Sequence, residues 1–425
     1  MKRPVLDIVA RLVLVALSLI GVVGVLRAKR QDRRRWISLP AQESRRGWMR
    51  HWVFGALAAV TAGVAVAAVA VVAGLVPIRA SSGHWSTTAW FLKFAMRRSV
   101  ATHTIGLSVP PLDSQLLVVK GATHYDIGCR PCHGSPGARA PRIAEQMTPH
   151  PPSLVETARD YDAGELFYIV KHGVKFTGMP AWAARQRDDE VWAVVAFVRR
   201  LPGFDAAQYE HLAMGGARLD ESRAPIESLV PPAGSAAARR SCQRCHGAAG
   251  VERGRGAFPV LDGQRLAYLD ATLEAYASGD RHSGIMGPIA AALPPHERRA
   301  IARSYADGRR PPAAEQGTAV ATGLIAEGAD IAARGRPDQD LPPCSRCHGP
   351  AADRDNPSFP RLAGQRSAYL ALQLRLFQAD RRGGTPYAHI MRKIAGRLTE
   401  EQMDAVAAYY ASLEPERPGG ASVRP

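Results

Sequence analysis

The sequence predicts an all-α protein in which an N-terminal membrane hairpin precedes three small helical domains. Three observations predict this architecture. After residue 110, apolar residues recur at helical spacing and alternating strand patterns are scarce. A C-x-x-C-H motif occurs three times at similar intervals, which indicates three repeated units. An uncharged run of 27 residues lies near the N-terminus and is long enough to cross a membrane.

The cysteines all belong to the three C-x-x-C-H motifs. This pattern is the attachment signature of a c-type haem, in which two thiols bond the porphyrin and the adjoining histidine ligates the iron. A disulfide framework and a zinc site are the alternatives, but neither explains a histidine directly after every cysteine pair. We therefore expect three covalently bound haem c groups. The thiols are Cys129, Cys132, Cys242, Cys245, Cys344 and Cys347, and the histidine ligands are His133, His246 and His348.

Residues 1–80 are predicted to form a transmembrane hairpin. Trp52–Ile78 is the stronger span, and Ile8–Leu26 is a second candidate that Arg11 weakens. The basic loop between them should stay in the cytoplasm, which places all later residues in the periplasm of a bacterium, anchored to its inner membrane. A single-helix anchor and a signal peptide cleaved after residues 1–26 are the alternatives.

The net charge of +17 does not predict nucleic-acid binding. Residues 1–51 hold 12 Lys and Arg against 3 Asp and Glu, and haem propionates would neutralise part of the remaining excess. Residues 81–113 follow the membrane segment and mix aromatic with basic side chains between 84 and 105. That composition predicts a helix lying on the membrane surface.

The expected domains span 114–205, 232–307 and 308–413, with a linker at 206–231 and a disordered tail at 414–425. Helices are expected to open and close each domain. The openers are Gln115–Ile127 and Gly317–Ala333, with only a short equivalent around Ala236–Arg240; the closers are His296–Tyr305, a helix capped by Asp188 or Asp189, and one capped by Thr399 with Gln402.

The second and third domains repeat each other. The block from Phe258-Pro259 through Gly263-Gln264 to Tyr268-Leu269 matches the block from Phe359-Pro360 through Gly364-Gln365 to Tyr369-Leu370. Farther on, Met286 aligns with Met391. An internal duplication explains both matches.

A helix, a C-x-x-C-H motif, a long loop with a methionine and a closing aromatic helix together resemble the class I cytochrome c domain. Domains two and three are similar to the tandem units of periplasmic di-haem cytochromes. Gly178-Met179-Pro180 in the first domain is similar to another cytochrome c ligand loop. The resemblance covers residues 114–413 and implies three class I domains in a membrane-anchored tri-haem cytochrome.

The sixth iron ligands are expected to be Met179, Met286 and Met391. They follow the three motif histidines by 46, 40 and 43 residues, and a thioether stabilises Fe(II). Each could instead be a core methionine. The rival ligands are His172, His282 and His389, with Met147 and Met403 fitting the spacing less well.

With both axial positions filled, the irons can only exchange electrons, so we expect an electron-transfer protein rather than an enzyme. Its expected partners are redox proteins, namely a terminal oxidase, a quinol-oxidising complex or a dehydrogenase. One alternative is a cytochrome subunit of a periplasmic dehydrogenase complex. The other is a peroxidase-like haem enzyme in which one iron stays open.

Overall fold

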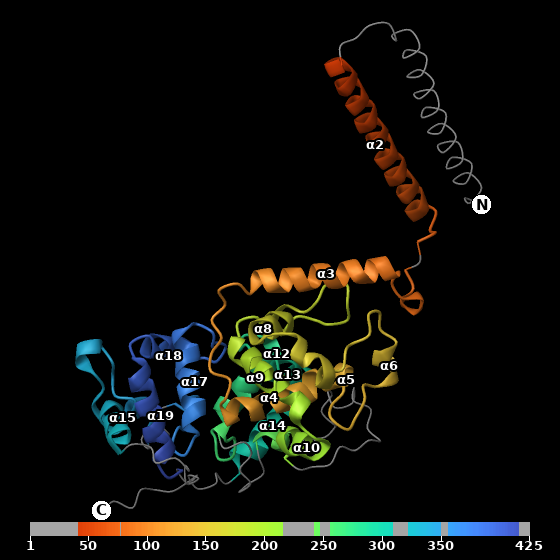
Figure 1. Cartoon of the computed structure of the whole chain (residues 1–425). Coiled ribbons are helices and arrows are strands. Elements are labelled where there is room, and N and C mark those ends of the chain that lie inside the picture. Colours follow the sequence, from red (N-terminus) through yellow and green to blue (C-terminus); the bar gives the residue numbers. More distant parts are fainter. Residues whose placement is uncertain are drawn as a thin grey trace, which may run out of the picture. The chain divides into compact units, whose positions relative to one another are not determined.

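A computed structural model describes residues 41–76, 78–215, 242–246, 256–308, 322–349 and 356–415. The chain divides into two compact units, one ending at Gly83 and one beginning at His84. The predicted all-α class is confirmed, because the described residues form helices and contain no strand beyond two isolated bridges (Figure 1).

The N-terminal unit contains helix α2 (Ala41–Val72). Its segment Trp48–Val72 has 25 residues, and an 18-residue window within it has a mean hydropathy of 2.3, enough by length and composition to cross a membrane. The helix stops before the predicted limit at Ile78 because Gly74 turns the backbone at a φ of 70°. The other predicted span, Ile8–Leu26, lies outside the described residues, so the hairpin stays a prediction.

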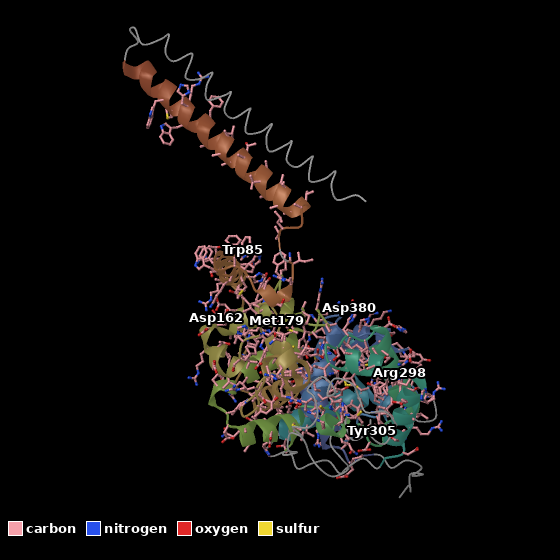
Figure 2. All side chains as sticks on the ribbon, turned by 90° about the vertical axis from the view of Figure 1, so that its right-hand side faces the viewer. Trp85, Asp162, Met179, Arg298, Tyr305 and Asp380 are labelled. Carbon is pink, nitrogen blue, oxygen red and sulfur yellow. The ribbon has the colours of Figure 1, made fainter. Side chains whose placement is uncertain are left out.

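The second unit begins with helix α3 (Ser86–His103), which follows the short turn η1 (Ala80–Ser82) and corresponds to the predicted surface helix. Trp85, which is labelled in Figure 2, directly precedes the first turn of α3. The last turn of α3 is held to the protein, since Val100 is buried and the His103 ring stacks on Tyr168 at 5.3 Å. Four large aromatic side chains near its start are exposed: Trp85, Trp90, Phe91 and Phe94.

The first haem region (residues 114–215) is organised by two crossing helices, α4 (Gln115–Gly128) and α9 (Asp188–Val198). They meet at Gly121, where a Cβ would overlap the Ala193 carbonyl oxygen and lie 2.8 Å from the Phe197 Cβ. Glycine therefore sets how closely these helices approach. The other elements are α5 (Arg130–His133), α6 (Arg142–Glu145), α7 (Leu154–Thr157), η2 (Ala158–Asp160), α8 (Ala163–His172), η3 (Leu201–Gly203) and α10 (Ala206–Met214).

The predicted linker at 206–231 is wrong at its beginning. Residues 206–214 form α10, which opens with a reciprocal capping box between Asp205 and Gln208. Tyr209 is fully buried and donates a 2.9 Å hydrogen bond to Asp126 on α4. This helix is thus part of the first haem region, and residues 216–231 lie outside the described chain.

The second haem region (residues 242–246 and 256–308) and the third (residues 322–349 and 356–415) share one plan. α12 and α17 begin at equivalent residues of the repeat, and so do α14 and α19. In the second region the helices are α12 (Leu266–Ser278), α13 (Met286–Ala292) and α14 (Pro295–Ala306). In the third they are α15 (Thr322–Arg334), η6 (Pro337–Gln339), α16 (Ser345–His348), α17 (Ser367–Gln378), α18 (Ala388–Ala395) and α19 (Glu400–Ser412).

The crossing of α15 and α19 reproduces the one in the first region. A Cβ on Gly328 would overlap the Ala405 carbonyl oxygen and lie 2.8 Å from the Tyr409 Cβ. The opening helix of the second region, predicted at Ala236–Arg240, lies outside the described residues.

Two of the predicted helix caps have different outcomes. The Thr399–Gln402 capping box is confirmed, because each residue binds the other's backbone N–H. Asp188 and Asp189 do not cap α9; Arg187 occupies the cap position, and its side chain makes no capping bond to a backbone N–H of the helix. The two carboxylates instead pair with Lys171 and Lys120, since burial makes a cation a better partner than water.

Candidate haem sites

Each C-x-x-C-H motif forms one helical turn. The histidine N–H donates to the carbonyl of the first cysteine at 2.9 Å, both from His133 to Cys129 and from His348 to Cys344. Positions i, i+3 and i+4 of a helix share one face, so the two thiols and the imidazole can address a single flat group. All six cysteines are half-buried, and none of them is joined in a disulfide.

The three motif histidines share a second contact that fixes how they can bind a metal. The Nδ1 atom of His133 lies 2.8 Å from the Pro152 carbonyl oxygen, that of His246 lies 3.1 Å from Pro259, and that of His348 lies 2.9 Å from Pro360. A carbonyl only accepts, so Nδ1 must carry the hydrogen. Nε2 then keeps its lone pair for iron, which is the usual arrangement of a metal-ligating histidine.

Burial also sets the protonation state of these groups. It lowers the pKa of His133, His246 and His348, which keeps each imidazole neutral at neutral pH, as a metal ligand must be. Burial, reinforced by Cys132, raises the pKa of the Cys129 thiol to about 12. A thiol that stays protonated at neutral pH disfavours direct ligation of zinc, which needs the thiolate.

Met179, which is labelled in Figure 2, lies in a loop that backbone hydrogen bonds close. Val174 N–H donates to the Met179 carbonyl at 3.2 Å, and the Met179 N–H donates to Thr177 Oγ1 at 3.1 Å. Met147 packs its sulfur against Gly178, so the fold brings this rival beside Met179. The other rival in this region, His172, is exposed and its ring lies 4.6 Å from that of Tyr168.

Met286 and Met391 occupy equivalent places at the start of short helices. Met286 is the first residue of α13, and Met391 lies in the first turn of α18, packed against Phe377. Both are half-buried, whereas the rival Met403 is fully buried in the core of the third region. The iron ligands themselves stay a prediction, as do the rivals His282 and His389.

The second and third regions also provide charge for a haem. Arg281 and Arg382 are 4% and 8% exposed, and neither guanidinium pairs with a carboxylate among the described residues. Their bonds go to hydroxyl groups instead. Arg382 donates to Tyr268 at 2.9 Å, and Arg281 donates to Thr272 at 3.2 Å and to Tyr369 at 3.5 Å. Buried cations without counter-ions fit the propionate carboxylates that a haem carries.

This cluster shifts the ionisation of one tyrosine. Burial alone would raise the pKa of Tyr268, but the neighbouring Arg382 and Arg281 lower it to about 7. The site therefore favours an anion at this position, in agreement with a propionate.

Equivalent glutamines join the second and third regions. The Gln264 side chain binds both the N–H and the carbonyl of Arg361, at 2.8 and 3.0 Å. Gln365 makes the same pair of bonds to Val260, at 2.8 and 3.0 Å. Because these residues correspond in the internal repeat, the two regions face each other through the same surface, as isologous partners do.

Two family models match parts of the chain that follow α3. Residues 117–198 match the family model described as cytochrome C oxidase, cbb3-type, subunit III, and residues 325–414 match the cytochrome c model. The thiosulfate dehydrogenase electron acceptor of Stutzerimonas stutzeri (strain A1501) is 34% identical over 193 residues, which are 45% of this chain and 88% of that protein. The chain is a multi-haem c-type cytochrome.

Further proteins similar to this chain are themselves named as c-type cytochromes. Cytochrome c-552 of Acidithiobacillus ferridurans is 36% identical over 176 residues, covering 40% of this chain and 73% of that protein. Cytochrome c4 of Thiocapsa roseopersicina is 32% identical over 185 residues, covering 43% and 92%. The cytochrome binds haem c and transfers electrons. This confirms the expected kind of cofactor and the expected class of function.

The proline carbonyls are functional groups that the sequence analysis missed. The repeat contained their signal, because Phe258-Pro259 and Phe359-Pro360 stand at matching positions after the motifs. The phenyl rings lie beside the same histidines, at 6.3 Å from His246 and 6.2 Å from His348. In the second and third regions, the repeated Phe-Pro pair therefore lies beside the motif histidine.

Proposed function

We propose that the cytochrome is a membrane-anchored carrier with three haem c groups. In this proposal it passes single electrons between a respiratory-chain donor and an acceptor such as a terminal oxidase. The observation that carries it is the same histidine–proline bond at His133, His246 and His348. A motif that did not hold haem would have no need for an imidazole whose free nitrogen is fixed in this way.

The methionines complete the proposed sites. Met179, Met286 and Met391 would fill the sixth positions, which leaves no iron open to a substrate. Haem, when bound, supplies one-electron exchange between Fe(II) and Fe(III). The protein's own residues hold each imidazole in its ligating form and provide cations at Arg281 and Arg382, which would pair with the propionates.

Comparison with relatives supports candidates for both partners. The match of residues 117–198 to an oxidase subunit supports a terminal oxidase as the acceptor. Two relatives named thiosulfate dehydrogenase electron acceptor favour a second candidate, in which the cytochrome serves a periplasmic dehydrogenase as its redox subunit. Rapid reduction of the purified cytochrome by a dehydrogenase, in the absence of quinol, would favour this second candidate.

The haem count is the direct test of the proposed function. The mature protein should carry three covalently attached haem groups by mass spectrometry, and its ferric spectrum should be low-spin throughout. Reduced protein should bind carbon monoxide slowly at every iron. Fewer than three haems, or one iron that binds carbon monoxide at once, would contradict the proposal and point to a haem enzyme.

Membrane attachment is proposed to use α2 as the anchor and α3 as a surface contact. A chain that begins at His84 behind a cleavable export signal should leave the membrane fraction in alkaline carbonate, whereas the full chain should stay in the pellet. The reason is that α2 exposes an apolar surface along 25 residues, while α3 offers only a few aromatic rings.

The contribution of α3 can be separated within the shortened chain. Changing Trp90 and Phe94 to serine should release it from vesicles even at low salt, because these stacked rings are both exposed. Changing the buried Val100 to alanine is the control and should leave vesicle binding unaltered. If the serine variant binds vesicles as tightly as its parent, α3 does not contact the membrane.

A further inference from the structure

One buried carboxylate, Glu190, contacts the methionine-bearing loops of two different haem regions. It lies in the first turn of α9 and is 3% exposed. Its Oε2 accepts hydrogen bonds from Trp182 Nε1 at 3.1 Å and from the Gly284 N–H at 2.7 Å. Its Oε1 accepts from the Ser283 hydroxyl at 2.7 Å.

These contacts connect Glu190 to the backbone of Met286, the proposed ligand of the second haem. Ser283 Oγ, which donates to Glu190, also accepts the Met286 N–H at 3.0 Å. The carboxylate is therefore joined to the first residue of α13 through one hydroxyl group. On the other side, Trp182 follows Met179 by three residues in the first-haem loop, and its N–H donates to Glu190.

Cationic side chains of the first region partly offset the desolvation cost of burying the Glu190 carboxylate. Arg187 Nη1 lies 3.0 Å from Glu190 Oε1 and also donates to the His282 carbonyl at 2.8 Å. Arg187 is in turn held by both oxygens of Asp189, which Lys120 approaches to 3.0 Å. Truncating one member of such a buried network leaves an unpaired charge, so each member is held in place by the others.

Close packing accompanies the hydrogen bonds. A Cβ on Gly284 would overlap the Trp182 indole, at 2.5 Å from Cε2, so the two loops touch without space between them. The internal repeat offers a comparison. Ala388 stands in the third region where Ser283 stands in the second, so the third-haem loop lacks the hydroxyl that makes this link.

We propose that Glu190 is a positioning residue that holds the methionine loops of the first and second haems in one fixed arrangement. The clamp formed by Glu190, Trp182 and Ser283 makes the ligand geometry of the second haem depend on the first region. The proposal rests on the proposed function insofar as Met179 and Met286 ligate iron. Fixing both loops to one carboxylate keeps the two haems at a constant separation for electron transfer.

The clamp is tested by hydrogen exchange and by redox titration of the full-length cytochrome. In Glu190→Ala, exchange at the Gly284 and Met286 amides should rise about tenfold. The Gly284 N–H loses its acceptor, and the Ser283 hydroxyl that accepts the Met286 N–H loses the carboxylate that holds it. The first and second haems should both change potential while the third stays as in the parent. Met179→Ala and Met286→Ala mark which titration step belongs to which haem.

Single-arm variants separate the two sides of the clamp. Ser283→Ala should alter the second haem alone, and Trp182→Phe the first alone. Asp188→Asn is the matched control, since this carboxylate on the same helical turn binds Lys171 and Arg381 and has no contact with residues 282–286. It should leave exchange at Gly284 and Met286 unchanged.

The outcomes distinguish failure of the clamp from failure of the ligand assignment. Unchanged exchange at Gly284 and Met286 in Glu190→Ala overturns the clamp, whatever the haems do. If exchange rises as expected but Met286→Ala leaves every haem spectrum intact, the clamp stands and the ligand assignment is wrong. A uniform change in all three haems would indicate general destabilisation and also overturn the proposal.

Discussion

Replacing Met286 with alanine should lower the potential of one haem by on the order of 100 mV or more and open that iron to carbon monoxide. A thioether favours Fe(II), and a hundredfold loss of this preference corresponds to about 120 mV for one electron. Met179→Ala and Met391→Ala should act in the same way on the first and third haems. A spectroscopic redox titration of each variant measures the three steps separately.

Two methionines that fit the ligand role less well provide controls for this series. Met403 is fully buried in the third region, so Met403→Leu should keep all three potentials. Met147→Leu is the sharper control, because the Met147 sulfur packs against Gly178, beside Met179. If Met147→Leu lowers the first-haem potential and Met179→Ala does not, the ligand assignment for that haem is wrong.

Gly328→Ala is expected to destabilise the third haem region by about 3 kcal/mol, a large share of the stability of a small domain. The added methyl group would overlap the Ala405 carbonyl oxygen, so α15 and α19 would have to separate. Their contact forms much of the core that includes Ile331 and Met403. Denaturant titration followed at the third haem should show an earlier transition.

Gly323 supplies the matched control on the same helix. A Cβ there would meet nothing within 4 Å, so Gly323→Ala changes only the helix propensity. It should be neutral or stabilise the region by about 0.4–1 kcal/mol. Equal effects of the two substitutions would show that the glycine at the helix crossing is not required by packing. Gly121→Ala on α4 should repeat the Gly328 result in the first region.

The helix crossings and the bonds within the methionine loops both restrict movement around the C-x-x-C-H motifs. Crossed helices at Gly121 and Gly328 give the first and third regions a rigid frame around each motif. The loop with Met179 is closed by its own backbone hydrogen bonds, and the Met286 N–H is held by the Ser283 hydroxyl. If Met179 and Met286 ligate iron as proposed, these contacts would hold their thioethers in place.

The sequence by itself determined the covalent chemistry of this cytochrome. The three C-x-x-C-H motifs identified the haem attachment, and the internal repeat paired Met286 with Met391. It also predicted the membrane-length helix, the surface helix and the Thr399 cap. Apart from the repeat, which matches two separate stretches of the sequence, these are local patterns, because they depend on residues within a few turns of one another or on composition alone.

Only the tertiary structure decided which distant segments meet. Nothing near residue 206 indicated that Tyr209 would be buried against Asp126, so α10 was mistaken for a linker. The Glu190 contacts with Ser283 and Gly284 join residues more than ninety positions apart, and the cap predicted at Asp188 gave way to pairing with Lys171. Such choices follow from the cost of burying charges without partners, and which partner is in reach is known only once the helices have packed.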